Sequence, residues 1–159
     1  LEVDFINMHT LAGKEAMKQA KAFMTEQKWN AALIGVTILT SLNQDHLHEF
    51  GLQTDLPNTV MTLCQLAKSS GLDGVVASAQ EASLIKQKCG DEFMTICPGI
   101  RRATDSVNDQ KRIMTPAMAM ENSADYIVVG RPIIQAQDPK REALLYFEEM
   151  EKGIKNAGK

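Results

Sequence analysis

Two short segments combine glycine with arginine, a combination that suits the binding of a phosphate group. They are Pro98-Gly99-Ile100-Arg101 and Gly130-Arg131-Pro132, and each follows an apolar, strand-like run. Glycine lets the main chain approach a ligand closely, and a guanidinium can donate two parallel hydrogen bonds to a phosphate or carboxylate. Together the segments predict an anion site. For either segment alone, a solvated loop, or a tight turn with a surface cap, remains the alternative.

Three further polar residues stand where ligand contacts are common. Ser78 follows an apolar run and begins Ser78-Ala79-Gln80-Glu81, which has the form of a capping box, so a helix cap is the favoured interpretation. Thr40 follows Val36–Leu39 and has the same ambiguity. Gln110 lies in the long non-periodic stretch Gly99–Ile113, and loops of that length in a compact α/β chain are usually functional.

Other chemistries lack support in the sequence. Asp45-His46-x-His48 has no third ligand nearby, so we expect no metal site. The nucleotide-binding G-x-G-x-x-G and P-loop patterns and the hydrolase pattern G-x-S-x-G are absent. Three cysteines, at positions 64, 89 and 97, match no zinc or redox spacing, which favours buried thiols in a reducing cytoplasm.

Length and charge limit the class of protein. The chain has 159 residues, which predicts a single domain over residues 1–159. With 17 basic and 20 acidic residues its net charge is −3, so no basic excess is available for nucleic-acid binding. No apolar run approaches the roughly 18 residues of a membrane span.

Apolar, β-branched runs alternate with helical patterns. The runs are apolar at nearly every position, which is typical of strands buried on both faces of a parallel sheet. The expected strands are Val3–Met8, Ala32–Leu39, Gly74–Ala77, Phe93–Cys97 and Tyr126–Val129. Helix starts are expected at the capping residues Asp55, Ser78, Thr115 and Asp138, and a proline follows all of these except Ser78. The last helix is expected to bury one apolar face, made of Ala143, Leu144, Phe147, Met150 and Ile154.

The resulting order is β-α repeated five times. Repeated units of this kind give either a doubly wound sheet or a (β/α)8 barrel. A complete barrel typically needs about 250 residues, so the pattern alone favours an open sheet of five strands.

A resemblance changes this expectation. Several segments, in their order and spacing, together resemble orotidine 5′-phosphate decarboxylases of the bacterial type. They are Asp4–His9, Gly35–Ser41, Gly71–Ala82, Pro98–Arg101 with Asp109–Pro116, and Val128–Ile133. The resemblance implies an α/β fold of the (β/α)8 TIM-barrel family, matched from about the fourth strand onward. We therefore expect an incomplete barrel of about five βα units. The absence of an initiator Met suggests a chain that begins inside a longer protein.

The resemblance also implies roles for the candidate residues. It implies conversion of orotidine 5′-phosphate to uridine 5′-phosphate in pyrimidine biosynthesis, by a homodimer with neither metal nor organic cofactor. Thr40 and Ser78 match contacts to the pyrimidine or ribose, and Pro98 a position beside the base. The remaining candidates match the family's contacts to the phosphate and the residues of the phosphate-side loop. They are Arg101, Gln110, Gly130 and Arg131.

The family's catalytic Asp-x-Lys-x-x-Asp array has no counterpart here. Asp55 resembles its last residue, but Phe50 and Leu52 stand where the array needs Asp and Lys, so we interpret Asp55 as a helix start. We therefore expect no catalytic residue in this chain, and no decarboxylation by the chain alone. A non-catalytic phosphate-binding or dimerising fragment, and a sugar-phosphate enzyme of the same superfamily, remain alternatives. An incomplete barrel is also expected to expose two strand edges and apolar interior residues.

Overall fold

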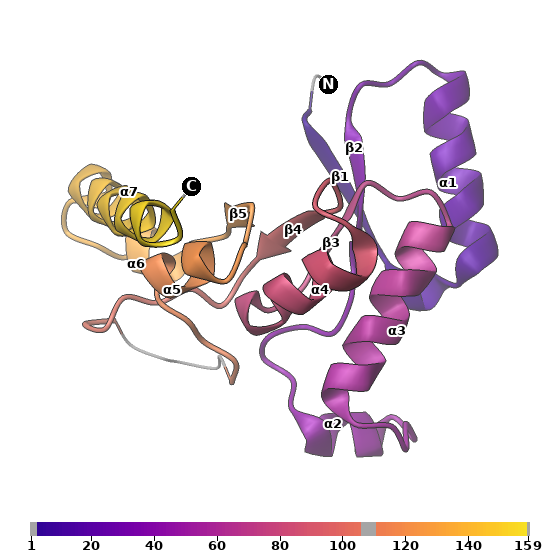
Figure 1. Cartoon of the computed structure of the whole chain (residues 1–159), viewed down its shortest axis with the longest axis horizontal. Coiled ribbons are helices and arrows are strands. Elements are labelled where there is room, and N and C mark those ends of the chain that lie inside the picture. The colour runs from indigo at the N-terminus through magenta and orange to yellow at the C-terminus, as the bar shows by residue number, and fades with distance from the viewer. Residues whose placement is uncertain (1–2, 106–110, 159) are drawn as a thin grey trace.

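One parallel sheet organises the chain. The computed structural model describes residues 3–105 and 111–158, and its five strands lie in the order β1-β2-β3-β4-β5 (Figure 1). The strands are β1 (Phe5–His9), β2 (Ala32–Val36), β3 (Gly74–Val76), β4 (Met94–Cys97) and β5 (Tyr126–Ile127). A doubly wound sheet reverses its strand order at a switch point. This sheet does not, so the expected incomplete barrel is confirmed and the doubly wound alternative is excluded.

A helix follows each strand, as the sequence predicts, and the additional short helix Gln44–Glu49 was not predicted. They are α1 (Lys14–Glu26), α2 (Gln44–Glu49), α3 (Leu56–Ser69), α4 (Ala82–Cys89), α5 (Pro116–Glu121), α6 (Arg131–Ile134) and α7 (Pro139–Asn156), with 3-10 turns η1 (Thr10–Ala12) and η2 (Ala79–Glu81). Side-chain caps are confirmed at three of them. Asp55 accepts from the Asn58 N–H at 2.8 Å, Thr115 from Met118 at 3.2 Å and Asp138 from Arg141 at 3.0 Å.

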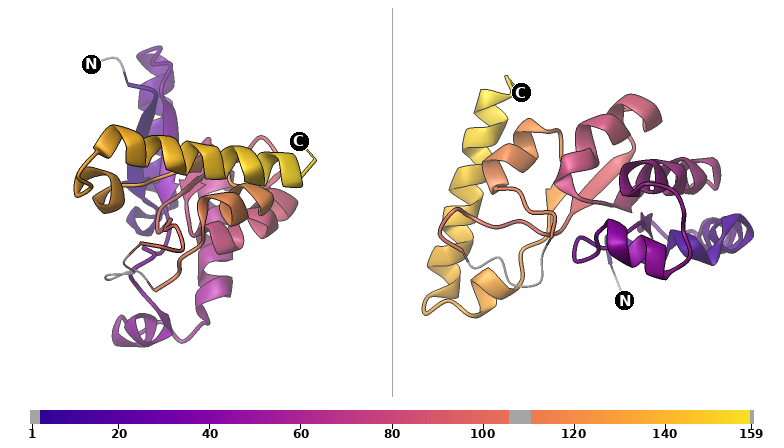
Figure 2. Two further views of the ribbon diagram at one scale, coloured as in Figure 1. Left: turned by 90° about the vertical axis from the view of Figure 1, so that its left-hand side faces the viewer. Right: turned by 90° about the horizontal axis from the view of Figure 1, so that it is seen from below.

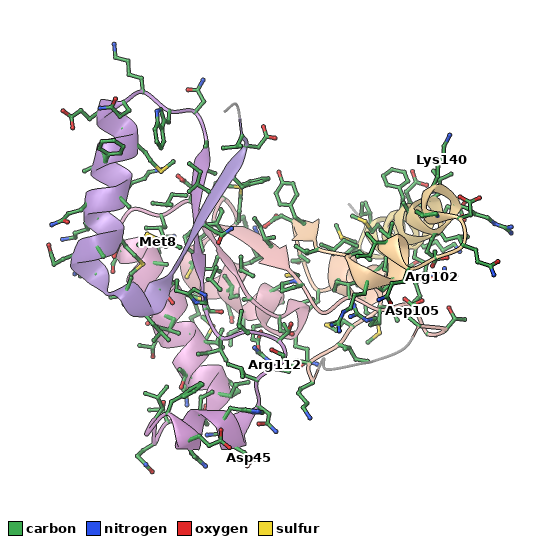
Figure 3. The ribbon with its side chains drawn as sticks, turned by 180° about the vertical axis from the view of Figure 1, so that it is seen from behind. Met8, Asp45, Arg102, Asp105, Arg112 and Lys140 are labelled. Atoms are coloured by element: carbon green, nitrogen blue, oxygen red, sulfur yellow. The ribbon has the colours of Figure 1, made fainter. Side chains whose placement is uncertain are left out.

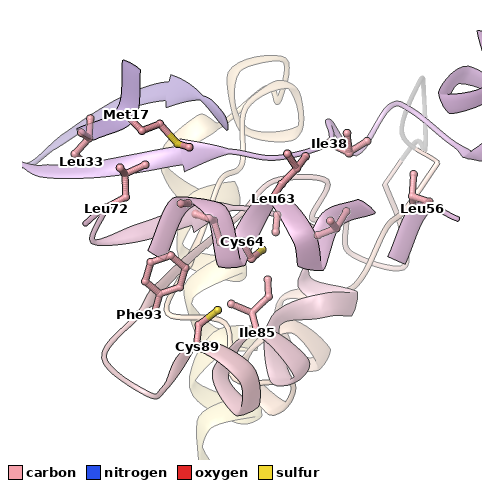
Figure 4. Close-up of a cluster of buried hydrophobic side chains, with 14 of the residues drawn as sticks. Met17, Leu33, Ile38, Leu56, Leu63, Cys64, Leu72, Ile85, Cys89 and Phe93 are labelled. Carbon is pink, nitrogen blue, oxygen red and sulfur yellow. The ribbon is translucent and has the colours of Figure 1, made fainter. Parts of the chain in front are cut away.

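Packing is one-sided, since alternate strand residues point toward the helices and the others toward the open face of the sheet. Leu33 and Val75 pack with Met17, Leu63 and Ile85 of α1, α3 and α4 in the larger core (Figure 4). A second core gathers Cys97 and Ile100 with Ala119 of α5 and Tyr146 of α7. The helices succeed one another around the sheet, as in a barrel (Figure 2).

The other face of the sheet is open at its two outer strands, whereas Ile34 and Val36 of β2 are buried. Phe5 on β1, Tyr126 on β5 and Val128 directly after β5 are between 37% and 49% exposed. This confirms the expected exposure of apolar residues that would face a barrel interior.

A repeated ion-pair arrangement holds the amino ends of the strands. Asp73, just before β3, accepts from the Leu33 N–H at 2.7 Å and pairs with Lys21 of α1. Asp125, just before β5, accepts from the Thr95 N–H at 2.7 Å and pairs with Lys86 of α4 at 2.6 Å. Each aspartate thus ties its own strand to the preceding strand and to a helix. In barrels this end of the sheet serves stability, which leaves the opposite end for function.

The predicted buried face of α7 is partly wrong. Leu144 and Phe147 are 54% and 56% exposed, whereas Tyr146 and Gly153 are buried. The reason is that α7 turns polar residues inward to meet Arg102, as described below, and packs Gly153 against the backbone of Ala117. Leu144 and Phe147 consequently lie away from the core, while Ala143, Met150 and Ile154 stay half-buried.

Candidate functional site

The carboxyl ends of the parallel strands bring the candidate residues to one edge of the sheet. Thr40 follows β2, Ser78 follows β3, Pro98 and Arg101 follow β4, and Gly130 and Arg131 follow β5. Active sites of barrel proteins occupy this edge. Gln110 lies outside the described residues.

Thr40 is held by a segment far away in sequence. It is buried, and its carbonyl oxygen accepts from the main-chain N–H groups of Lys111 at 3.1 Å and Arg112 at 3.3 Å. The chain entering α5 therefore packs directly on the end of β2.

Ser78 acts as the predicted cap. Its hydroxyl oxygen accepts from the Gln80 N–H at 3.3 Å at the start of η2, and the residue is 1% exposed. Glu81, the expected second member of a capping box, instead directs its carboxylate to Arg112. Contact between Ser78 and a ligand stays a prediction.

The chain after β4 turns inward. Pro98 is half-buried, and Gly99 has a φ of 78°, a left-handed conformation that favours glycine. The Arg101 N–H donates to the Met114 carbonyl at 3.0 Å, and its guanidinium donates to the Ile100 carbonyl at 2.7 Å. Arg101 is only 6% exposed. A solvated loop is therefore the wrong interpretation for Arg101, because the contact with Met114 draws it into the protein.

Gly130 leaves room at the end of β5. It is exposed, and a Cβ built on it would meet nothing within 4 Å. Its carbonyl accepts from Ile133 and Ile134 at 3.0 and 3.1 Å, which sets the turn into α6. Arg131 is the half-buried first residue of that helix. The turn and an open approach to the backbone are thus present together.

Sequence reasoning missed one buried ion pair at this edge. The Arg112 guanidinium pairs with the Glu81 carboxylate, and both residues are less than 9% exposed. Arg112 also donates from Nη2 to the carbonyls of Ile38 at 2.7 Å and Leu39 at 3.3 Å. Figure 3 shows Arg112 between the end of β2 and the chain leading to α5. Local sequence patterns cannot predict this pair, because its members are 31 residues apart in the sequence.

Burial and the Arg112 guanidinium shift the pKa of the Glu81 carboxyl in opposite directions. Burial raises the pKa of the Glu81 carboxyl above its usual value of 4.5, and Arg112 lowers it, as do the main-chain N–H groups of Ser78 and Glu81. Desolvation is the largest of these effects. Burial outweighs these contacts, so the pKa of Glu81 is raised overall.

A second polar cluster fixes the same loop to α7. Arg102 donates from Nε to Glu149 at 3.0 Å and pairs with Glu142, while the Tyr146 hydroxyl donates to Asp105. Figure 3 shows Arg102 and Asp105 beneath this helix. The loop that begins at Pro98 is thereby anchored on both sides, by Met114 and by α7.

Two other features bear on cofactors and location. Within residues 3–105 and 111–158, no three His, Cys, Asp or Glu side chains lie close enough to hold a metal ion. His46 instead contacts Asn43 in the cap of α2. None of the helices in this part of the chain has the length and apolar character needed to cross a membrane.

The fold and the site define a chain of the (β/α)8-barrel class, with its polar residues gathered at the carboxyl ends of the strands. The sequence model of the orotidine 5′-phosphate decarboxylase / HUMPS family matches residues 1–146. The chain belongs to this family.

Relatives and solved structures agree with this assignment. The chain is 51% identical over 155 residues to the orotidine 5′-phosphate decarboxylase of Carboxydothermus hydrogenoformans, a match that covers 95% of this chain and 65% of the relative. It is 52% identical over 134 residues to that of Hydrogenovibrio crunogenus, covering 84% and 57%. The crystal structure of the enzyme from Lactobacillus acidophilus superposes with a TM-score of 0.77 at 33% identity, covering 94% and 64%. The chain thus spans less than two thirds of the length of these proteins.

Proposed function

We propose that this chain forms the ligand-gripping part of an orotidine 5′-phosphate decarboxylase, a carboxy-lyase that produces uridine 5′-phosphate. One observation supports this most directly. In a chain that matches the family over residues 1–146, the candidate residues within the described part follow four adjacent parallel strands and lie at one edge of the sheet.

The proposed division of labour follows the strand order. Arg131 and the open backbone at Gly130 grip the phosphate, and Arg101 and Gln110 complete that side. Thr40, Ser78 and Pro98 orient the pyrimidine and ribose. Phosphate lies far from the reacting carbon of the substrate, so its binding energy serves to hold the substrate for the chemical step.

The chemical step itself needs charges that these residues do not supply. Loss of carbon dioxide from the pyrimidine leaves a carbanion. A lysine ammonium among carboxylates can stabilise that charge and then donate the proton. The family's Asp-x-Lys-x-x-Asp pattern does not occur in the 159 residues. Asp55 cannot replace it, because its carboxylate caps α3 at the Asn58 N–H. We propose that the 159-residue polypeptide binds uridine 5′-phosphate without decarboxylating orotidine 5′-phosphate.

Calorimetry and an activity assay on the purified polypeptide, with its mass verified, test this proposal. Arg131→Ala is expected to weaken uridine 5′-phosphate binding by at least about tenfold, since a charged hydrogen bond is worth roughly 1.5–3 kcal/mol. Arg141→Ala, which alters an exposed arginine on α7, is the matched control and should leave the affinity unchanged. An unchanged uridine 5′-phosphate affinity in Arg131→Ala, or decarboxylation of orotidine 5′-phosphate by the polypeptide, would contradict the proposal.

The remaining parts of the proposal concern assembly and location. We propose a homodimer that works in the cytoplasm without a metal or an organic cofactor. The three cysteines are unpaired, as a reducing compartment would keep them. A sugar-phosphate ligand is the competing possibility, and preference for ribose 5-phosphate over uridine 5′-phosphate in the same calorimeter would favour it.

A further inference from the structure

We propose that Arg112 and Glu81 are positioning residues, which set Thr40 and Ser78 for the nucleoside half of the ligand without touching the ligand themselves. This inference rests on the proposed function. It concerns a buried pair that the division of labour above does not use.

Arg112 joins the chain before α5 to the residues that follow β2. Its guanidinium reaches the carbonyls of Ile38 and Leu39, and its main-chain N–H donates to the carbonyl of Thr40. Three consecutive residues at the end of β2 are thus bound by one arginine. A planar fork of five donors can satisfy several carbonyls at once, whereas a lysine ammonium cannot reproduce that geometry.

Glu81 links Arg112 to Ser78. Glu81 lies one 3-10 turn after Ser78, and its N–H donates to the Ser78 carbonyl at 3.0 Å. The ion pair between Glu81 and Arg112 therefore connects this turn to the end of β2. Since β2 and β3 are neighbours in the sheet, the pair fixes the relative placement of Thr40 and Ser78.

Stability alone is a poor explanation for this pair. Burying two charges costs free energy that their attraction often only just offsets, and apolar replacements of similar size are often neutral or better. Arg112 Nε is also buried without a hydrogen-bond partner in the described part of the chain. A pair with this cost is better explained by the geometry that it imposes on Ile38–Thr40 and η2.

Arginine anchors on the phosphate side are separate from this pair. Arg101 follows β4 and Arg131 follows β5, whereas Arg112 and Glu81 act on the ends of β2 and β3. Loss of the pair should therefore weaken recognition of the nucleoside and spare recognition of the phosphate. A general loss of structure would weaken both.

The test compares two probes, uridine 5′-phosphate and ribose 5-phosphate, by calorimetry on the 159-residue chain. Arg112→Met is expected to weaken uridine 5′-phosphate at least about tenfold while ribose 5-phosphate changes less than about twofold. Arg112→Lys should bind uridine 5′-phosphate more tightly than Arg112→Met does, but more weakly than the unsubstituted chain. Lys111→Met is the matched control, because this exposed neighbour contributes its main-chain N–H to Thr40, which the substitution keeps.

A second variant covers the case in which Arg112→Met does not fold. The double variant Glu81→Leu with Arg112→Met removes both charges together, so it leaves no unpaired charge in the core. It should fold and still show the selective loss of uridine 5′-phosphate affinity. Unchanged selectivity in the folded variants, or equal losses for both probes, would overturn this inference alone. Failure of the unsubstituted chain to bind uridine 5′-phosphate would overturn the proposed function as well.

Discussion

Phe5 on the first strand and Tyr126 on the last pack edge to face, with ring centroids 5.1 Å apart. Three strands separate them in the sheet. A flat sheet with strands about 4.8 Å apart would hold β1 and β5 about 19 Å apart. The contact therefore reports that the sheet curls, as a barrel wall does.

This ring contact gives the first prediction. Edge-to-face pairs contribute about 0.5–1.5 kcal/mol beyond their burial, so a double-mutant cycle of Phe5→Leu and Tyr126→Leu should give a coupling of that size. The measurement is the free energy of unfolding in urea. Additive effects of the two substitutions would show that the two strands do not meet in solution.

The second prediction concerns pH. Because burial raises the pKa of Glu81 in the folded chain, the folded state holds this proton more tightly than the unfolded state does. The corresponding stability is present below the unfolded-state pKa and is lost as pH rises through the folded-state pKa. Glu81→Gln should therefore remove part of the decline in unfolding free energy above a pH of about 4.5.

Chemical denaturation at several pH values measures this difference, with the exposed Glu151→Gln as control. We expect the Glu81→Gln curve to be flatter than the control curve over that window. Parallel curves would mean that Glu81 titrates as it does in the unfolded chain.

Sequence patterns predicted the local features of this fold and missed the distant ones. Asp55, Thr115 and Asp138 were identifiable as caps because a cap acts within three residues of itself. The burial of Arg101 depends on Met114, and that of Glu81 on Arg112, so neither could be read from neighbouring residues.

Helix α7 shows the same limit. Its apolar stripe correctly predicted a helix, but not the face that packs. Arg102 attracts Glu142 and Glu149, and their inward turn leaves Leu144 and Phe147 exposed. A partner from another loop decides this orientation, and hydrophobic periodicity carries no information about it.

The third prediction uses that packing. A Cβ on Gly153 would lie 2.3 Å from the Ala117 carbonyl oxygen, which is backbone and cannot move aside cheaply. Alanine favours a helix by about 1 kcal/mol over glycine, but overpacking costs about 1–3 kcal/mol. We expect Gly153→Ala to lower the unfolding free energy on balance, as measured in urea. A stabilised variant would show that α5 and α7 are less closely packed than this contact indicates.

The fourth prediction concerns the thiols. Burial raises the pKa of Cys97 to about 12 and raises the pKa values of Cys64 and Cys89 as well. Thiolate is the reactive form. A chromogenic disulfide reagent at neutral pH should therefore find no fast-reacting thiol in the folded chain and all three in denaturant. Rapid labelling without denaturant would mean that the cores open readily.

The central claim is that the ends of neighbouring strands grip the phosphate of a nucleotide. A crystal structure of this chain soaked with uridine 5′-phosphate measures this most directly. The account predicts the phosphate beside the Arg131 guanidinium and the Gly130 backbone, with the base toward Thr40 and Ser78. A nucleotide bound anywhere else on the molecule would contradict it.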